Sequence, residues 1–344
     1  MLQRLYAQLP DYARPDNPVL RQVLSSGTRP PRRVRVLRLV LDGLLITLLV
    51  ILVIPGWQVM TGIGYPSRDV SGIIGPIFLA LYWPLVLAQI MIRTFSLTAA
   101  SGVIASETER GTWDTLKVTS EGAILMMKTR WAAVFYRLWV PLIILLILRL
   151  LFIVGALIDL GSFQGRYLDL LMSGTQPFGY PNVSSGTATV LGILLTSTAM
   201  VASLLAPFSA VAFDASVGML LGTLWRGRLM GALGQFTLVM VRLLITGCAL
   251  VIVALFLFGP ARLGAPGDNA AATIAVWLAA CFGIGEGDLS LTLVHLPLVQ
   301  QLWANVDYGI LVGLALLGYT LLQFALANLF VKWAARRAAR PDIT

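Results

Sequence analysis

One stretch of the chain, SETERGTWDTLKVTS at residues 106–120, crowds ionisable side chains between two long apolar segments. Ser106 and Glu109 have the spacing of a capping box, in which the two side chains satisfy free amides at a helix N-terminus. Four apolar side chains fall within one helical stripe: Trp113, Leu116, Ile124 and Met127. The stretch therefore predicts a short amphipathic helix with a charged face. Such a helix is suited to lying along a membrane or to docking a partner protein.

No catalytic constellation accompanies this stretch. The single histidine, His295, is expected at the surface of an external loop, and no helix-spaced pair of acidic residues suits metal binding or acid–base work. A phosphate-binding loop needs a lysine that follows glycine, and none of the three lysines, Lys117, Lys128 and Lys332, does so. We therefore expect no enzyme activity and no catalytic, cofactor-binding or metal-binding residue in this chain.

Membrane-spanning helices must position the charged stretch. The chain is 58% hydrophobic and 12% charged, with a mean hydropathy of +0.84, whereas a soluble domain is about one-quarter charged. A bilayer-spanning helix needs roughly 20 mostly apolar residues. Six segments qualify: 39–60, 72–97, 131–158, 188–222, 230–258 and 308–333. The predicted fold is an all-α polytopic membrane protein with six transmembrane helices.

A shorter apolar run at residues 271–285 precedes the last segment. It is short for a crossing, so we expect a re-entrant or interfacial element on the external side, within residues 270–300. The domain organisation predicted on this basis has three parts: a cytoplasmic segment 1–38 with an amphipathic elbow, a transmembrane domain 39–333, and a basic cytoplasmic tail 334–344.

The distribution of basic residues predicts the orientation. On the side of the termini, 18 lysines and arginines flank the segments, and only 3 lie on the opposite side. Because cytoplasmic loops carry the excess of Lys and Arg, both termini should be cytoplasmic in a multi-pass protein of the cell (inner or plasma) membrane. The net charge of +9 does not indicate nucleic acid, since no basic face with interleaved aromatic residues lies outside the membrane segments.

A few charged residues fall inside the apolar segments. Arg242 lies roughly 18 Å into the fifth segment at 1.5 Å per residue, and Asp214 lies in the fourth. Because intramembrane charges usually pair, we predict an intramembrane pair between Asp214 and Arg242. Arg93, Arg137 and Asp42, near segment ends, are expected to snorkel to the surface. The sequence leaves the role of Arg149 open.

The charged stretch resembles a known family. The run Glu107-Thr108-Glu109-Arg110-Gly111-Thr112-Trp113-Asp114-Thr115-Leu116, followed by Thr119 and Lys128, resembles the cytoplasmic signature of ABC-2 type transporter permeases. The stretch Asn17-Pro18-Val19-Leu20-Arg21 also resembles an opening found in some of these permeases. Ser120 stands where the family usually has proline, and Lys117 where a second leucine is common.

This resemblance implies the transmembrane permease subunit of an ATP-driven exporter. ATP and Mg would be bound by a separate ATP-binding cassette ATPase subunit. A second permease subunit, identical or different, would pair with this chain around a central path among the membrane lipids. Within a coupling segment at residues 101–128, the residues that would dock on the ATPase are Glu107, Glu109, Arg110, Gly111, Thr112, Trp113, Asp114 and Leu116.

Two alternatives stay open. The departures at Ser120 and Lys117 also fit a structural or regulatory membrane subunit of a larger complex, which keeps the permease fold without transporting. A secondary transporter driven by an ion gradient ranks last. That class often has ionisable residues near the membrane midplane, and Arg242 is the only strong midplane charge that the sequence reveals.

Overall fold

The computed structural model describes residues 9–25, 43, 74–102, 122–162, 185–224, 228–258, 270–295, 299 and 309–338. Within these ranges every element is helical, as predicted. The elements are η1 (Asp11–Ala13), α2 (Pro18–Ser25), α4 (Ile74–Ser101), α7 (Gly122–Ser162), α9 (Ser185–Gly222), α10 (Arg228–Phe258), α11 (Ala270–Glu286), η2 (Ser290–Leu293) and α13 (Leu311–Ala338). The first predicted span, 39–60, lies outside the described residues except for Gly43, and the docking residues 107–116 lie outside them entirely.

Five of these helices, α4, α7, α9, α10 and α13, are long and apolar enough to cross a membrane. They identify a multi-pass membrane protein. Many of their large apolar side chains point outward, for example Leu244 at 67% and Phe236 at 59% exposure on α10, which suits a lipid environment better than water. Apolar side chains therefore fill the core of the bundle and also cover much of its outer surface.

The third span begins earlier than predicted. Helix α7 starts at Gly122 rather than near residue 131, so the last part of the predicted coupling segment, residues 122–128, is continuous with this long helix. Met127 is fully buried and Ile124 is 37% exposed, so these two members of the predicted apolar stripe lie in different surroundings. The physical reason is that nothing between Gly122 and the apolar span interrupts the helix, and Met127 finds a place in the core.

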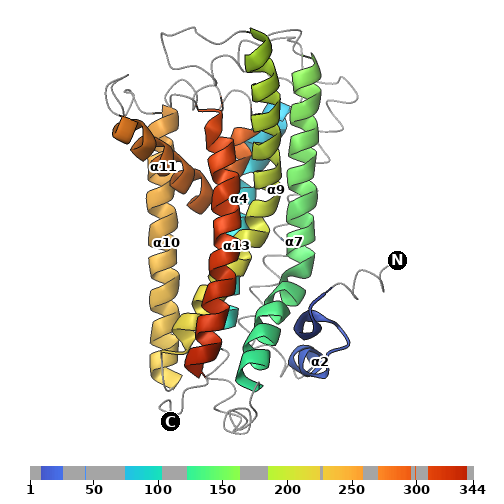
Figure 1. Cartoon of the computed structure of the whole chain (residues 1–344), viewed down its shortest axis with the longest axis vertical. Helices are drawn as coiled ribbons and strands as arrows, with labels where there is room; N and C mark the ends of the chain where they lie inside the picture. Colours follow the sequence, from blue (N-terminus) through green and yellow to red (C-terminus); the bar gives the residue numbers. More distant parts are fainter. Residues whose placement is uncertain are drawn as a thin grey trace.

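Figure 1 shows the five long helices as one bundle, with the C-terminus at its lower end. We call this end, where α13 finishes, the C-terminal end of the bundle. Helices α4, α9 and α13 run toward it, and α7 and α10 start from it. Gly102 and Gly122, the described residues on either side of the predicted docking stretch, therefore both belong to the C-terminal end.

Helices α4 and α9 run parallel and pack backbone against backbone. A Cβ on Gly218 would collide with the carbonyl oxygen of Leu97, and a Cβ on Gly222 would collide with that of Ser101. The two contacts are four residues apart on both helices, which is one helical turn. Gly218 and Gly222 thus form the seam along which these two helices meet, as pairs of small residues four positions apart do in membranes.

Helix α11 enters the bundle from the end opposite the C-terminal end. In Figure 1 it descends beside α10 to about half the height of the bundle. Helix α13 starts from the same end of the bundle as α11. Residues 286–290 follow as a turn leading into η2, and we call them the α11 tip. The path lies within residues 270–300, where a re-entrant or interfacial element was predicted, and we call α11 through His295 the re-entrant segment after that prediction.

A short amphipathic helix, α2, lies against the outside of α7. Asn17 caps it, because its Oδ1 accepts hydrogen bonds from the amides of Val19 at 2.9 Å and Leu20 at 3.4 Å. Leu20 is fully buried and packs with Ala133 and Tyr136 of α7. The cap and this apolar contact fix the N-terminal segment on the first third of α7.

The α4–α9 seam makes a prediction about stability. Gly218→Ala should lower the unfolding temperature of the protein in detergent, because the new methyl group meets a main-chain oxygen that cannot rotate away. Overpacking of this kind costs roughly 1–3 kcal/mol. Gly247→Ala on α10 is the matched control, since nothing lies within 4 Å of that position. Equal melting of the two variants would contradict the close approach of α4 and α9.

Candidate functional site

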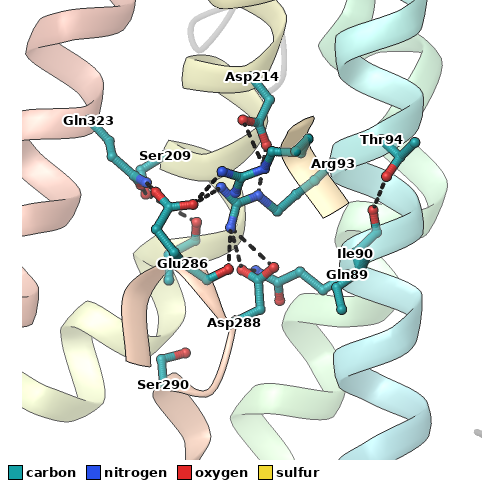
Figure 2. Close-up of polar contacts among 12 residues, drawn as sticks. Gln89, Ile90, Arg93, Thr94, Ser209, Asp214, Glu286, Asp288, Ser290 and Gln323 are labelled. Carbon is teal, nitrogen blue, oxygen red and sulfur yellow. Dashed lines mark hydrogen bonds and ion pairs between the residues drawn. The ribbon is translucent and has the colours of Figure 1, made fainter. Parts of the chain in front are cut away.

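The bundle buries six charged side chains where the α11 tip meets the long helices. They are Arg93, Arg149, Asp214, Arg242, Glu286 and Asp288. Figure 2 shows four of them, Arg93, Asp214, Glu286 and Asp288, with their side chains turned toward one another. None of the six is more than 8% exposed. Removing an ion from water costs several kcal/mol even in real proteins, so membrane proteins keep such residues where they pair or line a functional path. We call these six residues the charge cluster and take it as the candidate functional site.

Arg93 stands at the centre of the charge cluster and uses all three of its nitrogen atoms. Its Nε donates to Asp214 Oδ2 at 2.7 Å, and its Nη2 donates to Glu286 Oε2 at 3.0 Å. Its Nη1 lies 3.1 Å from both carboxylate oxygens of Asp288. The expectation that Arg93 snorkels to the surface is wrong, because three carboxylates inside the bundle replace the water that snorkelling would supply.

The contact between Arg93 and Asp214 continues the α4–α9 seam by one more turn. Gly218 follows Asp214 by four residues, and Leu97 follows Arg93 by four residues. Because the glycine brings the two backbones together, the guanidinium and the carboxylate can meet directly. The packing motif and the ion pair are therefore parts of one interface.

Arg242 reaches the same carboxylates from α10. Its Nη1 forms an ion pair with Glu286 Oε2, and its Nε lies 3.5 Å from Asp214 Oδ1. The structure thus places the predicted pair of Asp214 and Arg242 within ion-pair distance. The sequence did not reveal that Arg93 holds the shorter contact with Asp214, or that Glu286 lies between the two arginines.

Arg149 joins the charge cluster from α7 without an ion pair to any described carboxylate. Its Nη1 donates to the backbone oxygen of Ser203 and, at 2.7 Å, to Ser290 Oγ. Its Nη2 donates to Gln89 Oε1, and Gln89 Nε2 donates to Asp288 Oδ1 at 2.8 Å. The amide of Gln89 therefore bridges Arg149 to a carboxylate of the α11 tip.

Helix α13 completes the surroundings of Glu286. The hydroxyl of Tyr319 donates to Glu286 Oε1, and Gln323 Nε2 lies 3.3 Å from the same oxygen. Ser209 of α9 then donates to Gln323 Oε1 at 2.8 Å. All five long helices thus contribute a side chain to the network that holds the α11 tip.

Alternate glycines let the α11 tip fit between its neighbours. A Cβ at Gly283 would lie 2.6 Å from a methyl group of Val253, and a Cβ at Gly285 would lie 2.6 Å from the ring of Tyr319. The chain then turns at Asp288, whose φ of 59° lies in the left-handed region. Asp tolerates that region better than most side chains. The turn aims its carboxylate back at Arg93.

The charge cluster is electrically balanced, with three arginines and three carboxylates. Among the residues that the structure describes, no group of three or more His, Cys, Asp or Glu side chains could hold a metal ion. The carboxylates are instead neutralised by guanidinium groups, which supply directed hydrogen bonds as well as charge. Such an arrangement can hold a carboxylate-bearing segment or another anion through its guanidinium groups.

His295 was expected at a surface and is buried instead, with 6% exposure. It follows η2 in the described part of the re-entrant segment. Burial lowers the pKa of the imidazole to about 4, because desolvation disfavours the charged form. The side chain is therefore neutral near pH 7, and the prediction of a surface residue is wrong because the segment folds into the bundle.

Two local signals in the sequence could have pointed to the charge cluster. Gln89 and Arg93 are four residues apart, so both lie on one face of an otherwise apolar helix. Glu286 and Asp288 end an apolar run at a glycine-rich turn. Neither signal indicates which residues form the ion pairs, because the paired residues lie far apart along the chain.

The class defined by this fold and site is a multi-pass helical membrane protein with a buried arginine–carboxylate cluster at the turn that follows α11. Comparison with protein-family models, with curated proteins and with solved structures finds no match. The function must therefore be argued from the chain itself.

Arg93 should contribute more to stability than any exposed arginine. Arg93→Gln removes the positive charge that the carboxylates of Asp214, Glu286 and Asp288 share. Removing one partner of a buried ion pair costs about 3–5 kcal/mol of folding free energy. Thermal unfolding in detergent would measure the loss. Arg336→Gln, the same change at an exposed position of α13, should have little effect. A melting temperature of Arg93→Gln equal to that of the control would show that the charge cluster does not hold the bundle.

Proposed function

We propose that this protein is the transmembrane permease subunit of an ATP-driven exporter of the ABC-2 type, which moves an unidentified substrate by coupling to a separate ATP-binding subunit. The observation that carries the proposal is the run Glu107 to Leu116, with its acidic residues, Gly111-Thr112 and Trp113. The excess of basic residues on the same side supports a cytoplasmic location for this run, where an ATPase could reach it.

The geometry of the two flanking helices supports a mechanism. Helix α4 leads into the docking stretch and carries Arg93, and α7 leads out of it and carries Arg149. Arg93 lies eight residues before the end of α4, or about 12 Å at 1.5 Å per residue. In this mechanism a push on the docking stretch moves both arginines and so changes the packing around the α11 tip.

The N-terminal segment is fastened to α7 close to where that helix leaves the docking stretch. The ammonium group of Lys128 lies 5.6 Å from the centre of the Tyr12 ring, within reach of a cation–π interaction. Tyr136 donates a hydrogen bond to the backbone oxygen of Ala13 at 2.7 Å. The segment 9–25 would therefore move with the start of α7 when the ATPase engages.

A second candidate gains support from the charge cluster. The ion-gradient transporter ranked last because Arg242 was the only strong midplane charge that the sequence revealed, and the structure buries five more charged residues beside it. Ionisable residues at such depth often lie on ion pathways. A structural or regulatory subunit without transport remains the third possibility, and ATP dependence separates the first candidate from the other two.

Trp113 offers the sharpest test of coupling to an ATPase. Trp113→Ala should weaken co-purification of a phosphate-loop ATPase with the full-length protein by about 2 kcal/mol or more, roughly 30-fold, because buried aromatic anchors dominate such interfaces. Stimulated ATP hydrolysis should fall with it, while the melting temperature stays at the wild-type value.

Trp139→Ala is the matched control, because Trp139 is 63% exposed on α7, away from the docking stretch. This variant should retain the ATPase and its activity. The proposal is wrong if no phosphate-loop ATPase accompanies the wild-type protein, or if Trp113→Ala keeps full ATPase stimulation.

A further inference from the structure

The long helices by themselves carry a surplus of positive charge at the charge cluster. Four of its six members belong to these helices: Arg93, Arg149, Arg242 and Asp214. This set leaves two positive charges without compensation. The two missing negative charges, Glu286 and Asp288, arrive on the re-entrant segment. An arginine-rich site in four helices is thus filled by two carboxylates of a separate element.

The carboxylates of the α11 tip contact the arginines as a bound oxyanion does. Nη1 of Arg93 lies 3.1 Å from both oxygens of Asp288. One oxygen of Glu286 is shared between Arg93 and Arg242. Guanidinium groups present forked N–H donors that match carboxylate and phosphate oxygens equally well. The same donors can therefore accept a phosphate group in place of the tip.

The arginines also have donors that the tip leaves unused. Nε of Arg149 and Nη2 of Arg242 are buried and have no hydrogen-bond partner among the described residues. Buried donors are nearly always satisfied in native structures, so these two positions call for a further acceptor. A phosphate group carries more acceptor oxygens than a carboxylate and could reach donors that Glu286 and Asp288 do not.

We propose that Arg93, Arg149 and Arg242 form a binding site for a dianionic phosphate group, and that the α11 tip occupies this site as a built-in ligand. The two negative charges of the phosphate replace the two that leave with Glu286 and Asp288. This inference rests on the proposed function in that it names a substrate class for the transporter. Phosphate binding itself requires neither ATP nor a second subunit, so each proposal can fail while the other stands.

Removal of the tip's charges tests the site directly. In Glu286→Gln with Asp288→Asn, inorganic phosphate should raise the unfolding temperature of the full-length protein in a saturable way, at constant ionic strength. The wild-type protein should need about tenfold more phosphate or higher, because the tip is withdrawn in only a fraction of its molecules. Adding Arg149→Gln to the double variant should abolish the response.

A second variant displaces the tip without altering its charges. Gly285→Val forces a side chain against the Tyr319 ring, whereas a Cβ at Gly318 on α13 would have nothing within 4 Å, so Gly318→Val is the control. Gly285→Val should bind phosphate more tightly than Gly318→Val. Folded tip variants that show no difference from the wild-type protein and the control would overturn the proposal.

A third measurement leaves the charge cluster unaltered, in case the tip variants do not fold. Cys281 lies buried on α11 and Cys248 is exposed on α10, so Cys248→Ala leaves one thiol that reports movement of the re-entrant segment. Inorganic phosphate should accelerate its reaction with N-ethylmaleimide several-fold, because phosphate displaces the tip. A labelling rate that neither inorganic phosphate nor a phosphate-bearing lipid headgroup changes would contradict the proposal.

The phosphate group could belong to a free anion or to a lipid headgroup. The labelling experiment is therefore repeated in nanodiscs of phosphatidylcholine, with and without phosphatidic acid, in phosphate-free buffer. Acceleration by inorganic phosphate alone assigns a free anion, and acceleration by phosphatidic acid alone assigns a lipid headgroup. If neither accelerates the reaction, the arginines serve only to hold the tip and the proposal fails.

Discussion

The guanidinium of Arg93 stays charged inside an apolar bundle because three carboxylates surround it. Asp214 comes from α9 and the other two come from the α11 tip, so one side chain joins two helices and the re-entrant segment. The remaining members of the charge cluster follow from the same requirement. Arg242 forms an ion pair with the carboxylate of Glu286, which Arg93 also contacts. The side-chain amide of Gln89 links Asp288 to Arg149 through two hydrogen bonds.

Close packing and ion pairing support each other in this protein. Gly218 and Gly222 let α4 and α9 approach until Arg93 can reach Asp214. Gly283 and Gly285 let the re-entrant segment fit beside α10 and α13. Bringing the backbones closer shortens the ionic contacts, and shorter contacts in a low-dielectric interior are stronger. A change of packing along α4 or α7 would therefore change the ionic contacts at the α11 tip.

The helical architecture was predictable because length and hydropathy are local properties. Helix α11 coincides with residues 271–285, an apolar run that the sequence shows to be too short to span a bilayer. The start of α7 at Gly122 was missed because no breaker separates it from the apolar span. Among the charge-cluster contacts, only the pair of Asp214 and Arg242 was anticipated, since their helices are neighbours in sequence. The partnership of Arg93 with Asp288 spans 195 positions, and no local pattern encodes such a distance.

The central claim is that the α11 tip lies inside the bundle, and a disulfide tests it most directly. A Cβ at position 283 would lie 2.6 Å from a methyl group of Val253, so Gly283→Cys with Val253→Cys, in a background lacking Cys248 and Cys281, should crosslink nearly completely under mild oxidation. Gly247→Cys, which has open space around it, should not crosslink to Gly283→Cys. Failure of the first pair to crosslink in folded protein, or equal crosslinking of both, would contradict an inserted tip.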